Sequence, residues 1–231
     1  MALWYFRAKV SKFNGKNLAM VAAHCFTVVY KRGFWPQLQL GSASDRTLCV
    51  RQIRSIILHP WYSEANVRNA WDLVLVKIDP CPGITPVCLP EPETELRDHR
   101  NETWLADKNF IRKVCVYFGR KRGKIRKQAF VYPITRHYCS ASWDQDLYDD
   151  DDIFCAGYSS GTSPFNTACR GDSGGGLMCS DDWVNWALYG VTHWGPIRCS
   201  SHPKSLRLPN IYANVVASVR WIQRVINGSV Q

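Results

Sequence analysis

The chain has 231 residues, of which 46% are hydrophobic and 21% charged, and its 29 basic and 19 acidic residues give a formal net charge of +10. These proportions describe a globular chain and exclude a disordered or fibrous one. No uninterrupted apolar stretch reaches the roughly 18 residues of a membrane-spanning helix. Residues 1–7 lack the basic start and apolar centre of a secretory signal.

Short apolar runs separated by turn residues predict an all-β fold, either a barrel or a sandwich. Residues 50–58 and 73–78 are rich in β-branched side chains and predict strands, which Pro60 and Pro80 end. A charged stretch over residues 91–112 then predicts a surface linker between two halves of the molecule.

The second half adds an acidic run, Asp149–Asp152, which we expect in an exposed loop. Only the end of the chain predicts a convincing helix. Its aliphatic residues are spaced four, three and four apart and therefore share one helical face: Val215, Val219, Ile222 and Ile226.

Three local motifs carry the chemistry. The sequence Cys-Arg-Gly-Asp-Ser-Gly-Gly-Gly at 169–176 surrounds Ser173 with glycines, as expected where backbone N–H groups converge on one point. Upstream stand Ala-Ala-His-Cys around His24 and Trp-Asp-Leu-Val-Leu-Val-Lys around Asp72. The chain order His, Asp, Ser is that of a chymotrypsin-type triad. Through these motifs the sequence resembles the trypsin/chymotrypsin family of serine proteases over about residues 18–226.

The resemblance implies an all-β, chymotrypsin-like fold of two six-stranded antiparallel Greek-key barrels with a C-terminal α-helix. Residues 1–112 would form the first barrel and linker, carrying His24 and Asp72. Residues 113–231 would form the second barrel and the helix, carrying Ser173, and the two halves would make one peptidase domain.

The implied activity is that of a secreted serine endopeptidase that cleaves peptide bonds through an acyl-enzyme intermediate. Ser173 would be the nucleophile, His24 its general base, and Asp72 the group that orients the imidazole. The backbone N–H groups of Gly171 and Ser173 would form the oxyanion hole. No cofactor and no metal ion are expected.

The primary specificity pocket is expected to be neutral. Thr167 stands six residues before the nucleophile, where tryptic members carry an aspartate. Without a carboxylate a substrate Lys or Arg would be buried without a partner. Trp194, Gly195 and Asn210 would line the walls, and Asn210 replaces the usual glycine, which would narrow the pocket or add a polar contact. The size preference stays open.

The ten cysteines indicate an oxidising compartment. The resemblance implies the disulfides Cys115–Cys179, Cys139–Cys155 and Cys169–Cys199. Disulfides are favoured over a zinc site for the other cysteines, although their partners stay open, because histidines are not clustered with them: Cys25, Cys49, Cys81 and Cys88.

Two sequons make Asn101 and Asn227 candidates for glycosylation. Together with the cysteines they predict an extracellular protein, whose signal peptide is not present in this sequence. The basic run Arg120–Lys127 is interpreted as a solvated loop, with binding of a polyanionic glycan as the alternative. Nucleic acid is not expected, because no aromatic residues interleave the run. The expected partners are protein or peptide substrates and protein protease inhibitors.

The sequence departs from the family pattern in two places that bear on activity. Active members begin with Ile or Val followed by Val-Gly-Gly, and the freed amino group pairs with the aspartate before the serine, here Asp172. No such segment stands in the sequence, so we expect an incomplete N-terminus and weak activity of the chain as written. His193 replaces the serine before Trp-Gly that normally contacts the catalytic aspartate. A catalytically silent homologue with a binding or regulatory role is the alternative hypothesis.

Overall fold

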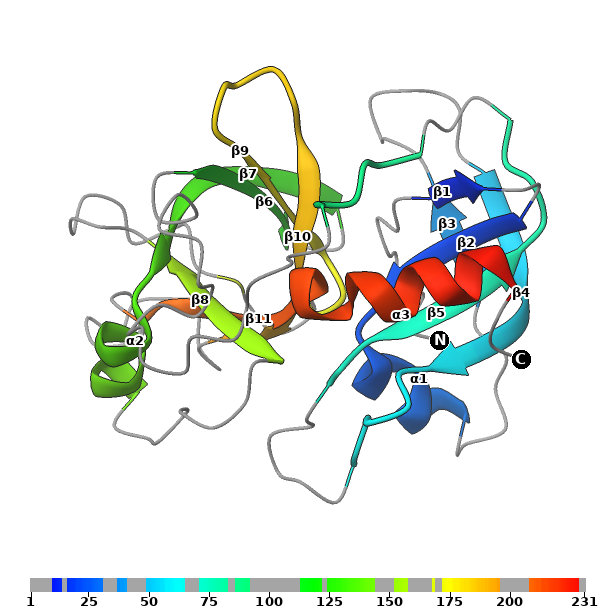
Figure 1. The fold of residues 1–231 in the computed structure, drawn as a ribbon, viewed down its shortest axis with the longest axis horizontal. Coiled ribbons are helices and arrows are strands. Elements are labelled where there is room, and N and C mark those ends of the chain that lie inside the picture. The colour runs from blue at the N-terminus through cyan, green and yellow to red at the C-terminus, as the bar shows by residue number, and fades with distance from the viewer. Residues whose placement is uncertain are drawn as a thin grey trace.

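The structure is a computed structural model. It describes residues 10–13, 16–30, 37–40, 49–64, 71–82, 86–91, 113–121, 124–143, 152–157, 168, 172–195 and 208–228. Over these ranges the chain forms a five-stranded sheet and a closed six-stranded barrel, which lie side by side, and the C-terminal helix runs from the edge of the barrel across the sheet (Figure 1).

The first half is an antiparallel sheet with the strand order β1-β2-β5-β4-β3. The central strand β5 (Val74–Ile78) is buried except at Lys77, as expected for a strand covered on both faces. The two strands predicted here are confirmed. The second six-stranded barrel that we expected is not shown, because the described residues provide no partner that joins the edge strands β1 and β3. The remaining strands are β1 (Val10–Phe13), β2 (Lys16–Val21), β3 (Gln37–Leu40) and β4 (Cys49–Leu58).

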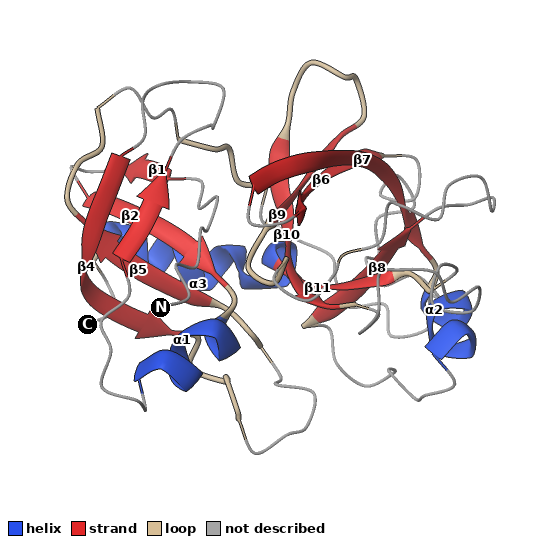
Figure 2. Cartoon of the chain, turned by 180° about the vertical axis from the view of Figure 1, so that it is seen from behind, coloured by secondary structure: helices blue, strands red, loops and turns tan. Residues whose placement is uncertain are grey.

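The second half is the closed barrel, with the strand order β10-β11-β8-β7-β6-β9 (Figure 2). Closure leaves no unpaired strand edge. The large side chains of Tyr117, Phe154 and Tyr212 fill its core. The strands are β6 (Val114–Lys121), β7 (Lys124–Ile134), β8 (Ile153–Gly157), β9 (Gly176–Ser180), β10 (Ala187–Trp194) and β11 (Asn210–Asn214).

Two of the three implied disulfides are confirmed. Cys115–Cys179 joins β6 to β9 within the barrel, and Cys139–Cys155 joins helix α2 (Arg136–Trp143) to β8. A further disulfide, Cys49–Cys81, joins the start of β4 to the segment after β5. The third implied bond, Cys169–Cys199, lies outside the described residues.

The predicted C-terminal helix is confirmed as α3 (Val215–Asn227). The Asn214 side chain accepts a hydrogen bond from the Ala217 backbone N–H at its start. Gly228 ends it in the left-handed conformation, at φ 79°. Two short helices, α2 and α1 (Ala23–Tyr30), were not predicted. None of these helices is long and apolar enough to cross a membrane.

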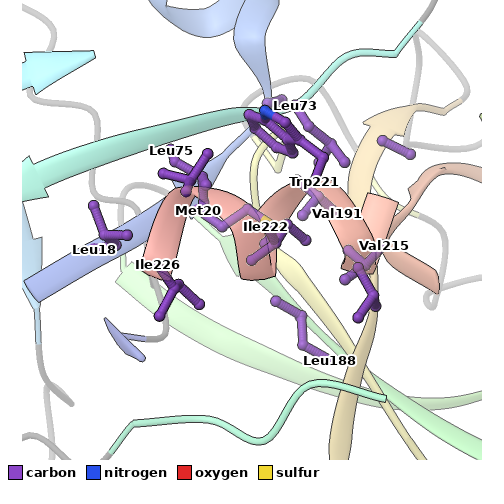
Figure 3. Close-up of a cluster of buried hydrophobic side chains, with 14 of the residues drawn as sticks. Leu18, Met20, Leu73, Leu75, Leu188, Val191, Val215, Trp221, Ile222 and Ile226 are labelled. Atoms are coloured by element: carbon purple, nitrogen blue, oxygen red, sulfur yellow. The ribbon is translucent and has the colours of Figure 1, made fainter. Parts of the chain in front are cut away.

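Helix α3 ties the two halves together through one buried cluster (Figure 3). Leu18, Met20 and Leu75 come from the sheet, and Leu188 and Val191 come from β10 of the barrel. The apolar face of α3 packs against both groups with Val215, Val219, Ile222 and Ile226. This packing holds the parts of the molecule that carry His24 and Asp72 against the part that carries Ser173. The division of the chain at residue 112 stays a prediction.

Candidate active site

His24 and Asp72 are brought together by the end of β2 and the start of β5. His24 lies in the first turn of α1, directly after β2, and its Nδ1 donates to Asp72 Oδ2 over 2.6 Å. The His24 backbone N–H donates to the other carboxylate oxygen over 2.7 Å. Asp72 is fully buried. An ionised carboxylate only accepts hydrogen bonds, so the His24 proton stands on Nδ1.

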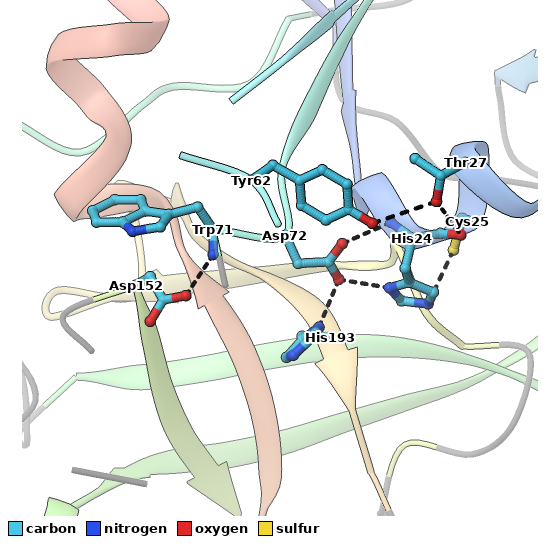
Figure 4. Close-up of polar contacts among 8 residues, drawn as sticks. All are labelled: His24, Cys25, Thr27, Tyr62, Trp71, Asp72, Asp152 and His193. Carbon is cyan, nitrogen blue, oxygen red and sulfur yellow. Dashed lines mark hydrogen bonds and ion pairs between the residues drawn. The ribbon is translucent and has the colours of Figure 1, made fainter. Parts of the chain in front are cut away.

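A second imidazole contacts the same carboxylate oxygen (Figure 4). His193 lies on β10, is buried, and donates from Nδ1 to Asp72 Oδ2 over 2.6 Å. Burial alone raises the pKa of the Asp72 carboxyl, but the hydrogen bonds from His193 and His24 hold that pKa below its usual range. His193, which stands where the family pattern has a serine, therefore supplies a second ring N–H to this aspartate.

The other ring nitrogen of His24, Nε2, faces Cys25. Cys25 Sγ lies 3.4 Å away, and Cys25 and Cys88 are free thiols in the described part of the chain. Burial lowers the pKa of His24, yet the hydrogen bonds and charges of Asp72 and Cys25 outweigh it and raise this pKa to about 10. Neither His24 nor any other described residue hydrogen-bonds the Ser173 hydroxyl. The raised pKa favours the imidazolium form of His24, which has to lose its Nε2 proton before it can act as a general base.

Ser173 sits in a tight turn that β10 holds in place. Gly174 N donates to Thr192 O over 2.8 Å, and Thr192 N donates to Gly175 O over 2.7 Å. Gly174 has φ 85°, a conformation in which glycine avoids the strain that a side chain brings. Thr192 precedes His193 in β10, so one strand supports both the serine turn and the Asp72 carboxylate. Gly171 lies outside the described residues.

Trp71 and Asp152 position Asp72 from the other side. Trp71 adopts the left-handed conformation at φ 53°, which is rare for a bulky residue. Its backbone N–H donates to Asp152 Oδ2, from the segment that precedes β8. The interpretation of the acidic run as an exposed loop is therefore wrong at Asp152, which is buried because its carboxylate accepts this hydrogen bond. Residues 149–151 lie outside the described ranges.

Two of the four predicted pocket residues, Asn210 and Gly195, lie beside Ala168, and Trp194 directly precedes Gly195 at the end of β10. The Asn210 side chain is buried, and its Oδ1 accepts from the Ala168 backbone N–H over 2.7 Å. A Cβ on Gly195 would stand 2.7 Å from Ala168 O, so only glycine fits there. Trp194 stacks on Trp143 with ring centroids 5.0 Å apart.

The predicted pocket residue Thr167 lies outside the described residues, as does the sequon at Asn101. Asn227 is exposed at the end of α3, and its glycosylation stays a prediction. The basic run 120–127 falls at the turn between β6 and β7, where residues 122 and 123 are not described.

Comparison with known proteins places the chain in a family. The Trypsin family profile matches residues 13–222. The atrial natriuretic peptide-converting enzyme of Homo sapiens is 31% identical over 223 residues, which are 91% of this chain and 19% of that protein. Coagulation factor XI of Bos taurus is 29% identical over 229 residues, covering 93% of this chain and 32% of that protein. The chain spans less than half the length of these relatives.

The fold is also similar to that of a solved structure. Neuropsin, a serine protease expressed in the limbic system of mouse brain, superposes with a TM-score of 0.61 at 19% sequence identity. The match covers 96% of this chain and 86% of that one. Because the Trypsin profile matches residues 13–222, the chain is a member of the trypsin family of serine proteases.

Proposed function

We propose that the protein is an extracellular serine endopeptidase in which Ser173 attacks the peptide carbonyl and His24 takes the hydroxyl proton. The observation that carries this proposal is the 2.6 Å contact between His24 Nδ1 and the buried Asp72 carboxylate. It fixes the tautomer in which Nε2 is the basic nitrogen, and it stabilises the imidazolium that forms on proton transfer. The backbone N–H groups of Ser173 and Gly171 receive the oxyanion.

The proposed substrate specificity is for an uncharged side chain at the cleaved position. Thr167 provides no carboxylate, and the Asn210 amide is engaged by the Ala168 backbone and by the Tyr212 hydroxyl, 3.2 Å away. A Lys or Arg side chain would lose its hydration without gaining a counter-charge. Proteins and peptides are the proposed substrates.

A second candidate is a catalytically silent member of the family that binds partners without cleaving them. The contact between His24 Nε2 and Cys25 Sγ favours it, because that contact occupies the nitrogen that must accept the serine proton. In the enzyme this contact has to open when substrate binds. In the silent homologue it persists.

The two candidates are separated by hydrolysis of a peptide library, with Asp72→Asn as the matched variant. The enzyme is expected to cleave after uncharged residues. Asp72→Asn is expected to lower kcat by about 10⁴-fold, because the amide stabilises the wrong imidazole tautomer. Absence of cleavage supports the silent homologue, and dominant cleavage after Lys or Arg contradicts the proposed pocket.

A further inference from the structure

Three ligand atoms of metal-binding type converge beside the serine turn. His24 Nδ1 and His193 Nδ1 each lie 2.6 Å from Asp72 Oδ2, and one possible ligand atom from each of the three residues lies within 4.8 Å of the other two. They come from three separate elements, namely α1, the segment before β5, and β10. Two imidazole nitrogens and one carboxylate oxygen are a donor set that Zn²⁺ takes in sites with three protein ligands and one open position.

The surroundings of these atoms suit a cation that enters from one side. The Asp72 side chain is 0% exposed and that of His193 is 6% exposed, whereas that of His24 is 27% exposed. The carboxylate supplies a negative charge at the buried end, where an unpaired cation would be costly. Because His24 is the most exposed of the three side chains, the ion and a fourth ligand would enter from its side.

We propose that His24, Asp72 and His193 form an inhibitory site for Zn²⁺; this regulation rests on the proposed protease function. The two N–H···O contacts of 2.6 Å are replaced by three metal–ligand bonds. A doubly protonated imidazole releases its Nδ1 proton to solvent, whereas a neutral one gives up its Nδ1 proton and takes one up on Nε2, so that each ring keeps one proton. Ligand atoms on tetrahedral zinc stand about 3.3 Å apart, given bonds of about 2.0–2.2 Å. Each Nδ1–Oδ2 separation therefore lengthens by somewhat less than 1 Å.

Inhibition follows from the tautomer that the ion imposes on His24. With zinc on Nδ1, the one remaining ring proton stands on Nε2, which then donates a hydrogen bond and has no lone pair to accept the Ser173 proton. The Asp72 oxygen is also engaged and no longer orients the imidazole. Zinc thus removes the general base without touching the serine turn.

His193 is the residue on which the site depends. His24 and Asp72 alone supply two ligands, which bind zinc weakly, and a serine hydroxyl in place of His193 is a poor ligand at neutral pH. The histidine adds the third ligand and brings it from the barrel. His193→Asn keeps an N–H donor for Asp72 while removing the imidazole ligand, so it separates metal binding from support of the carboxylate.

Zinc binding is tested by calorimetry on the full chain carrying Ser173→Ala, which prevents self-digestion. One Zn²⁺ per chain is expected, with affinity reduced at least about 100-fold when His193→Asn or His193→Ser is added. His137→Gln, which removes an exposed histidine on α2, is the matched control and should leave the affinity unchanged. Equal zinc affinity with and without the His193 imidazole overturns the site. Circular dichroism confirms that each variant is folded.

The inhibitory role is tested on the chain with Ser173 intact. Zinc should suppress peptide hydrolysis at the concentration at which it binds, and a chelator should restore it. Hydrolysis that persists with zinc bound overturns the inhibitory role. Zinc binding by a chain that never hydrolyses peptides supports the metal site and contradicts the proposed protease function, so the two failures are distinguishable.

Discussion

At the scale of single residues, the orientation of Asp72 depends on the backbone conformation of its neighbour. Trp71 holds φ 53°, and such a conformation costs about 1–3 kcal/mol unless the surroundings enforce it. The Asp152 carboxylate, which receives the Trp71 N–H, is the group that does so. A residue 81 positions along the chain thereby helps to aim the carboxylate that receives His24 and His193.

Asp152→Ala is expected to leave the Trp71 N–H unpaired and to lower the free energy of unfolding by about 1–3 kcal/mol. It should lower kcat more than it raises KM, because Asp152 acts on Asp72 and does not touch substrate. Asp152→Asn keeps an oxygen acceptor for the Trp71 N–H and serves as the control. Its losses of kcat and of unfolding free energy should be smaller. Steady-state kinetics and thermal unfolding measure both effects. Equal kcat values for the two variants would refute this positioning role.

Elements of regular pattern could be predicted from the sequence. The strands over residues 50–58 and 73–78 were recognisable from β-branched residues, and α3 from its apolar spacing. Helix α1 could not be predicted from the sequence, because it has only eight residues and follows β2 after a single intervening residue, Ala22. Its apolar residues show no clear helical period.

Contacts between distant segments could not be predicted. The burial of Asp152 depends on a hydrogen bond across 81 residues, and the Cys49–Cys81 disulfide on the pairing of β4 with β5. The local sequence pattern around these residues indicates neither the hydrogen bond nor the disulfide, because both join segments that are far apart in the chain. The candidate triad was identifiable because each of its three residues lies in its own recognisable motif. The resemblance already placed His193 where the family's serine contacts the aspartate, but that both imidazoles bond to the same Asp72 oxygen needed the fold.

The junction between β4 and β5 carries a pH-sensitive element at His59. This imidazole stacks on Trp71 at 4.5 Å and meets the edge of Trp221 of α3 at 4.6 Å. Burial, assisted by the positive charge of Arg224, lowers the pKa of His59 to about 4. The folded protein therefore holds this histidine neutral at pH values where the unfolded chain, with a pKa near 6.5, binds a proton.

Stability should consequently be full above pH 6.5 and fall as the pH drops from 6.5 to 4. His59→Gln, which keeps an acceptor but does not titrate, should flatten this part of the curve. The measurement is the midpoint of urea unfolding between pH 4 and pH 8 for both proteins. Parallel curves for the two proteins would show that another titrating group causes the loss of stability at acid pH.

On the scale of the whole molecule, α3 holds the sheet and the barrel in a fixed position relative to each other. Ile222 is buried in the cluster that joins the sheet to the barrel. Ile222→Ala should lower the free energy of unfolding by about 2–5 kcal/mol. It should also reduce hydrolysis in the folded protein, because His24 and Ser173 lie on opposite sides of this contact. Gln223→Ala, on the more exposed face of α3, is the control. An equally large loss of unfolding free energy in this variant would contradict the role assigned to the buried face.

The central claim is that Ser173 is the single nucleophile of a serine endopeptidase, and covalent labelling tests it most directly. A fluorophosphonate should add one adduct to the folded chain, and peptide mapping should locate that adduct on Ser173. Ser173→Ala should abolish both the adduct and peptide hydrolysis while leaving the unfolding midpoint nearly unchanged. An adduct or hydrolysis that persists undiminished in Ser173→Ala would contradict the assignment.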